Sequence, residues 1–324
     1  MAFVVALDPG YGNTKVATPA GVTVMQSAIA RPRNVGMAAD GVKVAQRPKS
    51  VIMADGREYV AGPGAWVWGD PETSMDYSDL VSQRRIGLFY AAFAEHNKPG
   101  LYNVDLLVIG LPVPLMQNEL QAKPFYESLK VYKGGHAFRV DGEAYEINIK
   151  RVKVLAQPVG AYAEWSLDDQ GLLRRGASQA EVGVIDLGMN TLDLFVVKGW
   201  EISPRYLGGE KLGVRRLLEA LNGHHDRDIE ELDALLRSQS LTANDSNLDD
   251  WLSSILGSLE RNGWGSLRRF DAIIPTGGGV SVLGGKLHNA LTSKGAVVYW
   301  PKKPVTPVAA NVAGLYKWGL RVCR

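Results

Sequence analysis

The sequence predicts an α/β protein with two domains, each built on a mixed sheet with helices on its faces. Two segments carry this prediction, because both consist of a strand that ends in Asp-x-Gly, a tight polar turn and a second strand. They run from Val4 to Val16 and from Gly183 to Phe195, about half the chain apart. The 324 residues are enough for two ordinary domains, each with its own core.

Apolar residues recur at strand or helix spacing along both halves. We expect strands at 3–8, 14–18, 23–28, 49–53, 58–61, 104–111, 130–140, 143–149, 150–156, 270–275 and 296–300, besides those of the second repeat. We expect helices at 80–94, 117–129, 158–163, 214–221, 229–236, 248–259, 284–291 and 309–319, and a polar loop at 237–247. Residues 31–71, rich in Gly, Pro and Ala, predict a small β-rich subdomain inserted in the first domain.

Composition excludes several classes of protein. Hydrophobic residues make up 46% of the chain and charged residues 22%, which is typical of a globular protein, and the net charge of +2 argues against a surface that coats nucleic acid. One cysteine, Cys323, excludes an internal disulfide and a cysteine-based zinc site. Adjacent histidines point apart, so His224-His225-Asp226 predicts a solvated loop. No signal peptide or bilayer-length apolar run is present, so we expect a cytoplasmic protein without a membrane partner.

The turn of each repeat is suited to anionic oxygens. Gly10, Gly12 and Gly188 permit the backbone conformations and the close approach that let several N–H groups face one anion. Asp8 and Asp186 bring one carboxylate to each turn, which suits a hydrated magnesium ion. The paired hairpins therefore predict a nucleotide clamp.

Five segments follow one another in a fixed order: the first repeat, residues 156–161, the second repeat, residues 274–279 and residues 309–314. This order resembles the phosphate 1, connect 1, phosphate 2, adenosine and connect 2 motifs of the actin-like ATPase superfamily. The short chain, residues 8–15 and residues 206–214 most resemble the ParM/StbA plasmid-segregation branch and its archaeal actin relatives. The resemblance extends from residue 3 to about residue 318.

The resemblance implies an actin-like (ribonuclease H-like) two-domain fold with the nucleotide in the interdomain cleft. Domain I would cover residues 1–155 and domain II residues 156–324, with a helical insert at about 222–262 and a C-terminal helix able to pack back on domain I. The implied activity is hydrolysis of ATP with Mg²⁺, GTP being the alternative nucleotide. The implied partners are further copies of the chain in a filament and an adaptor protein bound to centromere-like DNA. We expect the filament contact within 222–262 or, failing that, within 31–71.

The resemblance also assigns roles to residues. Asp8 and Asp186 would hold Mg²⁺ through water, Lys15 would reach the β- and γ-phosphates, and Gln157 would align the attacking water. Further nucleotide-binding residues would be Gly10, Tyr11, Gly12, Asn13, Thr14, Gly188, Met189, Asn190, Thr191, Gly208, Gly209, Glu210, Lys211, Gly277, Gly278 and Gly279, the last three against the purine. Asp193 would be structural.

Each role has a structural alternative. Asp8 could be a turn carboxylate at a strand end, Lys15 a solubilising residue on an edge strand, and Gln157 a helix-start residue before Pro158. Residues 277–279 could form a plain strand-to-helix turn. Rival functions are a sugar or small-acid kinase, for which no sugar loop is identified, and a chaperone-type ATPase, for which no β-domain follows residue 324. A third rival is a binding module that does not hydrolyse, which the presence of both aspartates disfavours.

Overall fold

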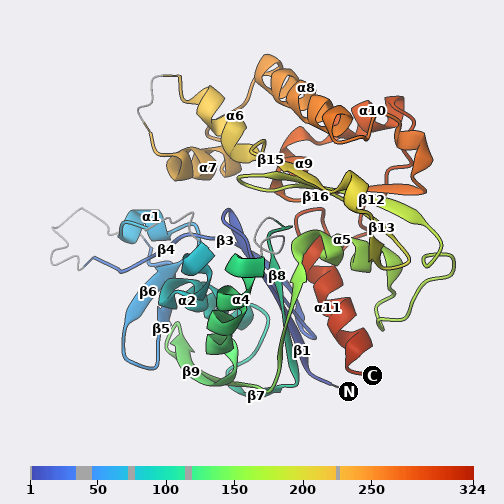
Figure 1. Cartoon of the computed structure of the whole chain (residues 1–324). Coiled ribbons are helices and arrows are strands. Elements are labelled where there is room, and N and C mark those ends of the chain that lie inside the picture. The colour runs from blue at the N-terminus through green and yellow to red at the C-terminus, as the bar shows by residue number, and fades with distance from the viewer. Residues whose placement is uncertain (1, 34–45, 72–76, 114–118, 224–226) are drawn as a thin grey trace. The chain divides into compact units, whose positions relative to one another are not determined.

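The computed structural model describes residues 2–33, 46–71, 77–113, 119–223 and 227–324 (Figure 1). It divides into two compact units. Unit 1 consists of residues 1–156 and 319–324, and unit 2 of residues 157–318. Residues 224–226, which include the predicted His-His-Asp loop, lie outside the described residues.

The first sheet of unit 1 has five strands in the order β11-β8-β1-β2-β3. They are β1 (Val4–Pro9), β2 (Asn13–Thr18), β3 (Gly21–Gln26), β8 (Leu106–Leu111) and β11 (Val152–Ala156). The central strand β1 is parallel to β8 and antiparallel to β2, and all of its residues are buried. A strand covered on both faces needs a nearly continuous apolar run, which β1 has up to Asp8.

Unit 1 contains a second sheet, of six strands, in the order β4-β6-β5-β9-β10-β7. Its strands are β4 (Ile29–Ala30), β5 (Lys49–Ile52), β6 (Glu58–Ala61), β7 (Gly100–Val104), β9 (Gly134–Val140) and β10 (Glu143–Ile149). The stretch predicted as a β-rich insert, residues 31–71, contributes β5 and β6 to this sheet, and its residues 34–45 lie outside the described residues. Val51 pairs with Val140 and Ile52 with Arg139, so β5 and β6 extend the β9–β10 hairpin. Strands of two to four residues form a stable sheet only with further strands beside them.

Helix α2 (Gln83–Ala94) connects the cores of the two sheets of unit 1. Every residue from Arg85 to Phe93 is buried, and the apolar ones belong to one cluster with β1 and β8 on one hand and with β5, β6 and β9 on the other. A helix that is buried on all sides needs apolar residues around its circumference, which this one has. Further helical elements among the described residues of unit 1 are α1 (Ala65–Trp68), η1 (Tyr77–Val81), α4 (Glu119–Ser128) and η2 (Leu129–Tyr132).

Unit 2 is built on one sheet in the order β14-β13-β12-β16, with β15 also paired to β13. The strands are β12 (Glu181–Leu187), β13 (Leu192–Lys198), β14 (Glu201–Ile202), β15 (Gly208–Glu210) and β16 (Ala272–Thr276). Alternate residues of β12 enter different cores: Ile185 and Leu187 enter one, and Val182 and Val184 enter the other. The sheet is thus covered on both faces.

The helices of unit 2 divide between these two cores. The first core contains residues of α6 (Val214–Leu221), α7 (Ile229–Arg237), α8 (Asp245–Arg261), α9 (Gly278–Leu283) and α10 (Gly285–Ser293). The second contains residues of α5 (Gln157–Ser166) and of α11 (Ala310–Val322). Figure 1 shows α5 and α11 side by side, and α8 and α10 along the opposite face of the sheet. Short helical turns lie at η3 (Pro204–Tyr206) and η4 (Leu267–Arg269).

Two predicted elements of unit 2 differ from the structure. Residues 296–300 form no strand of the sheet but only a single parallel bridge between Val298 and Ile273. The loop predicted at 237–247 ends earlier, because Asn244 caps α8 by accepting a hydrogen bond from the Asn247 N–H. None of the helices in the described ranges is long and apolar enough to cross a membrane.

Candidate functional site

The first Asp-x-Gly turn joins β1 to β2 and is held from behind. Ser27 Oγ donates to the Gly10 carbonyl at 2.7 Å, and Arg85 Nη1 donates to the same oxygen at 3.2 Å. The Ser27 N–H donates to the Gly12 carbonyl at 3.1 Å. A Cβ on Gly10 would lie 2.8 Å from the Asn13 carbonyl oxygen, so this tight turn requires glycine there. The backbone from Gly10 to Asn13 is therefore fixed before any ligand binds.

Asp8 and Lys15 form a buried ion pair beside this turn. They are cross-strand partners on β1 and β2, and Lys15 Nζ donates to Asp8 Oδ2 at 2.8 Å. Asp8 is 1% and Lys15 8% exposed. Because β2 lies between β1 and β3, the alternative of Lys15 as a solubilising residue on an edge strand is wrong. A buried ion pair is weak evidence for stability, so these two residues remain candidates for function.

The second Asp-x-Gly turn joins β12 to β13 and is closed by the Gly188 N–H, which donates to the Thr191 carbonyl at 2.9 Å. The first N–H groups of α6 donate to carbonyls of the same turn. The Val214 N–H donates to the Gly188 carbonyl at 3.0 Å, and the Arg215 N–H donates to the Met189 carbonyl at 2.8 Å. The start of α6 thus satisfies carbonyls of the turn, much as Ser27 and Arg85 do in unit 1.

Asp186 stands at the end of β12 and is almost completely buried. Asn311 Nδ2 donates to Asp186 Oδ2 at 2.7 Å. On the side of Oδ1 lies Gly277, which has φ +94°, and a Cβ there would come within 2.7 Å of Oδ1 and 2.4 Å of the Leu187 carbonyl oxygen. Three motifs that are distant in sequence therefore meet at one carboxylate. Asn311 is a site residue that the sequence reasoning missed.

Asp193 lies directly across the hairpin from Asp186. Thr191 Oγ1 donates to Asp193 Oδ2 at 2.8 Å. Burial, reinforced by the negative charge of Asp186, raises the pKa of Asp193 to about 7. The sequence predicts a structural role for Asp193, and the structure places it next to the predicted metal-binding aspartate.

The remaining predicted residues lie in different settings. Gln157 is the first residue of α5 and is half-buried. Glu210 faces α8, where Arg261 Nη2 and Ser258 Oγ each donate to it at 2.7 Å, and Arg261 in particular lowers the pKa of this carboxyl. Lys211 is exposed.

Close packing within unit 2 by itself requires glycine at positions 277 and 279. A Cβ on Gly279 would lie 2.5 Å from the Leu187 side chain, and one on Gly277 would strike the Leu187 backbone. Helix α9 begins at Gly278. The turn must therefore be narrow to fit against β12, whether or not a purine lies on it.

Each unit has one buried carboxylate beside its glycine turn, Asp8 in unit 1 and Asp186 in unit 2. The described residues contain no group of three or more His, Cys, Asp or Glu side chains that could enclose a metal. Mg²⁺ usually keeps several waters and binds proteins through one or two carboxylates together with substrate phosphates. Each of these carboxylates, taken by itself beside its glycine turn, is the kind of ligand that Mg²⁺ takes from a protein.

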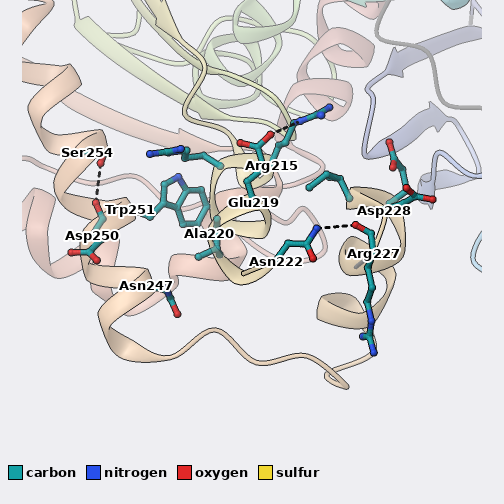
Figure 2. Close-up of a pocket in the computed structure, with 14 residues that line it drawn as sticks. Arg215, Glu219, Ala220, Asn222, Arg227, Asp228, Asn247, Asp250, Trp251 and Ser254 are labelled. Carbon is teal, nitrogen blue, oxygen red and sulfur yellow. Dashed lines mark hydrogen bonds and ion pairs between the residues drawn. The ribbon is translucent and has the colours of Figure 1, made fainter. Parts of the chain in front are cut away.

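A cavity of about 870 Å³ lies between α6, α8 and the start of α7 (Figure 2). Basic and acidic side chains both line it, among them Arg215, which pairs with Glu219, and Asp250 on α8. Trp251 forms one wall and donates from Nε1 to the Leu212 carbonyl at 2.8 Å. None of the predicted nucleotide-binding residues lines this cavity.

Comparison with known proteins gives matches across the chain. Residues 6–160 match the family described as actin like proteins N terminal domain. An archaeal actin homolog from Thermoplasma acidophilum is 25% identical over 310 residues, which cover 88% of this chain and 90% of that protein.

Solved structures match over nearly the whole chain. The apo ParM protein of psk41 has a TM-score of 0.73 at 19% identity and covers 99% of this chain and 98% of its own. An archaeal actin homolog in complex with ADP has a TM-score of 0.70 at 21% identity and covers all of both chains. A 15-stranded ParM filament from Clostridium botulinum has a TM-score of 0.67 at 18% identity, and the match covers 98% of this chain and 99% of the filament chain. At these identities the structures establish the fold.

Proposed function

We propose that this chain is an ATPase that assembles into filaments. The premise of the proposal is that the chain belongs to the actin-like ATPase superfamily and has the actin-like fold. The observation that carries the proposal is the pair of hairpins. Each has a buried aspartate at a strand end, Asp8 or Asp186, followed by a glycine turn whose carbonyls are already bonded. One hairpin belongs to each proposed domain, residues 1–155 and 156–324.

The nucleotide would be bound by the backbone N–H groups of both turns. Lys15 supplies a cation beside the first turn, and the phosphates would compete with Asp8 for it. Asp8 would then be available to the water ligands of Mg²⁺, with Asp186 as the second carboxylate. When bound, Mg²⁺ neutralises negative charge on the phosphates. ATP is the proposed nucleotide and GTP the alternative.

Hydrolysis would be the in-line attack of water on the γ-phosphate. A neutral amide cannot take a proton as a base, but it can align a water, so Gln157 would orient the nucleophile from the start of α5. Asp186 would fix the same water or the magnesium hydration shell from the end of β12. The backbone turns are preorganised and would stabilise charge on the transferring phosphoryl group.

Assembly and cargo are the second part of the proposal. Likeness to a ParM filament and to an Alp12 filament supports self-association, and we propose residues 222–262 as the longitudinal contact. Asp245 and Asp249 in this segment lie at the start of α8 and pair with Lys286, at 3.1 and 2.7 Å. Plasmid DNA would be moved in the cytoplasm through an adaptor, since the net charge of +2 gives little attraction to phosphates.

Sedimentation with and without ATP and Mg²⁺, followed by negative-stain microscopy of the pellet, tests this function. A pellet that needs nucleotide, together with phosphate release, supports a filament-forming ATPase. Repeating the assay with GTP decides the nucleotide. ATP turnover that is stimulated by a sugar without any pellet would instead support a kinase of the same superfamily, and binding without turnover would support a module that does not hydrolyse.

A further inference from the structure

We infer that Asn311 is a positioning residue that fixes the carboxylate of Asp186 for the reaction, an inference that rests on the proposed ATPase function. The donor and acceptor atoms are 2.7 Å apart, and Asn311 is 1% exposed. The two residues are 125 positions apart in the chain, so α11 must be in place before Asp186 is held.

The chemistry of the pair determines which way the amide faces. Both oxygens of an ionised carboxylate are acceptors, so the side chain at 311 must present its NH₂ group to Asp186 Oδ2. A hydrogen bond to a charged acceptor is shorter and about twice as strong as a neutral one. Asn311 therefore restrains one oxygen of Asp186, and Gly277 packs closely beside the other, since a Cβ at 277 would lie 2.7 Å from Oδ1.

The surroundings of Asp186 are not arranged for maximal stability. Within the described residues, Asn311 Oδ1 and Asp193 Oδ1 are both buried without a hydrogen-bond partner. A buried acceptor without a partner lowers the free energy of unfolding, and a half-satisfied polar network is less stable than an apolar one. Two such atoms beside one carboxylate indicate that the site keeps its polar groups for function.

The backbone around Asn311 is locked from two sides. Helices α5 and α11 cross so closely that a Cβ on Gly160 would lie 2.2 Å from the Asn311 carbonyl oxygen, and one on Gly314 would lie 1.7 Å from the Gly160 carbonyl oxygen. Thr276 Oγ1 donates at 2.8 Å to the carbonyl of Pro307, just before α11. Since α5 begins with Gln157, the same pair of helices carries the residue that would align water and the residue that holds Asp186. Such rigid support is what a reacting group requires.

Steady-state kinetics of Asn311→Leu and Asn311→Ala test the inference. Both substitutions remove the donor; leucine has nearly the same shape, and alanine is small enough to fit if leucine does not. We expect kcat for ATP hydrolysis to fall about 10- to 100-fold, whereas KM and the dissociation constant of a fluorescent ATP analogue stay within about threefold. A residue that only stabilises the fold would not separate kcat from KM in this way.

Tyr299→Phe is the matched control. Tyr299 also donates to a buried carboxylate of unit 2, from its hydroxyl to Glu164 Oε2 at 3.2 Å, and it lies outside the proposed machinery. Its kcat should stay within about twofold of wild type. If the wild-type protein hydrolyses ATP and the folded Asn311 variants keep its kcat, or if Tyr299→Phe loses as much, the inference is wrong. If the wild-type protein hydrolyses no nucleotide, the proposed function fails and the inference with it.

Discussion

The ion pair between Asp8 and Lys15 gives the most direct test of how the first hairpin is built. Lys15→Met keeps the length of the side chain and removes its charge. Asp8 is 1% exposed and would lose the cation 2.8 Å from its Oδ2, and breaking one side of a buried pair typically costs about 3–5 kcal/mol. The double variant Asp8→Asn with Lys15→Met leaves no buried charge, so its stability should return to within about 1 kcal/mol of wild type.

Urea unfolding of the wild type, both single variants and the double variant measures this coupling. Because the chain has two compact units, the curves are fitted with two transitions, and only the one that involves unit 1 should move. ATP affinity should fall at least about tenfold in Lys15→Met and stay low in the double variant, since Lys15 would contact phosphate. The reasoning would be refuted if Lys15→Met lowered the free energy of unfolding by less than about 1 kcal/mol. It would also be refuted if the double variant lost as much free energy of unfolding as the two single variants together.

Three further outcomes are expected. Asp186→Ala should lower ATP hydrolysis about 100-fold or more while nucleotide binding partly survives through the glycine turns, and a wild-type turnover number would contradict its role. Gln157→Ala should still bind ATP and assemble but release phosphate and disassemble slowly; an unchanged rate of phosphate release would leave Gln157 as a helix-start residue. Burial lowers the pKa of His136, so the neutral ring is favoured in the folded state. Its contribution to stability is therefore complete above the unfolded value of 6.5 and is lost as the pH falls below it, so urea midpoints at pH 7 and pH 5 should differ less in His136→Gln.

Local signals were sufficient to predict both hairpins from the sequence. An apolar strand, Asp-x-Gly and a polar turn specify each one within about a dozen residues, and Asp141-Gly142 likewise predicted the β9–β10 turn, where both residues have positive φ. Helix α6 has the predicted bounds because its apolar residues recur at helical spacing. The ion pair of Asp8 and Lys15 could also be predicted, since the hairpin register places the two residues opposite each other.

Contacts between distant segments could not be predicted in this way. The pairing of β5 with β9 joins two strands almost 90 residues apart, and the residue pattern of neither strand identifies its partner. The bond from Asn311 to Asp186 depends on how α11 crosses α5. One signal did point to it: Asn311 is the single polar residue in the Ala-Ala-Asn-Val-Ala-Gly segment, and a buried amide among small apolar residues needs a partner.

The two hairpins are alike in sequence but differ in electrostatics. In the first, a cation neutralises Asp8 at 2.8 Å. In the second, a neutral amide holds Asp186, and Asp193 lies opposite it on the paired strand, where burial and then the negative charge of Asp186 raise the pKa of Asp193 to about 7. Substitutions at the two aspartates are therefore not equivalent. Asp8→Asn would leave a buried ammonium group without its counter-ion, whereas Asp186→Asn would keep the hydrogen-bonding shape of the site and relieve its excess of negative charge. A loss of stability in the first variant thus reflects the Lys15 pair, and only a loss of turnover in the second, folded variant reports on the carboxylate itself.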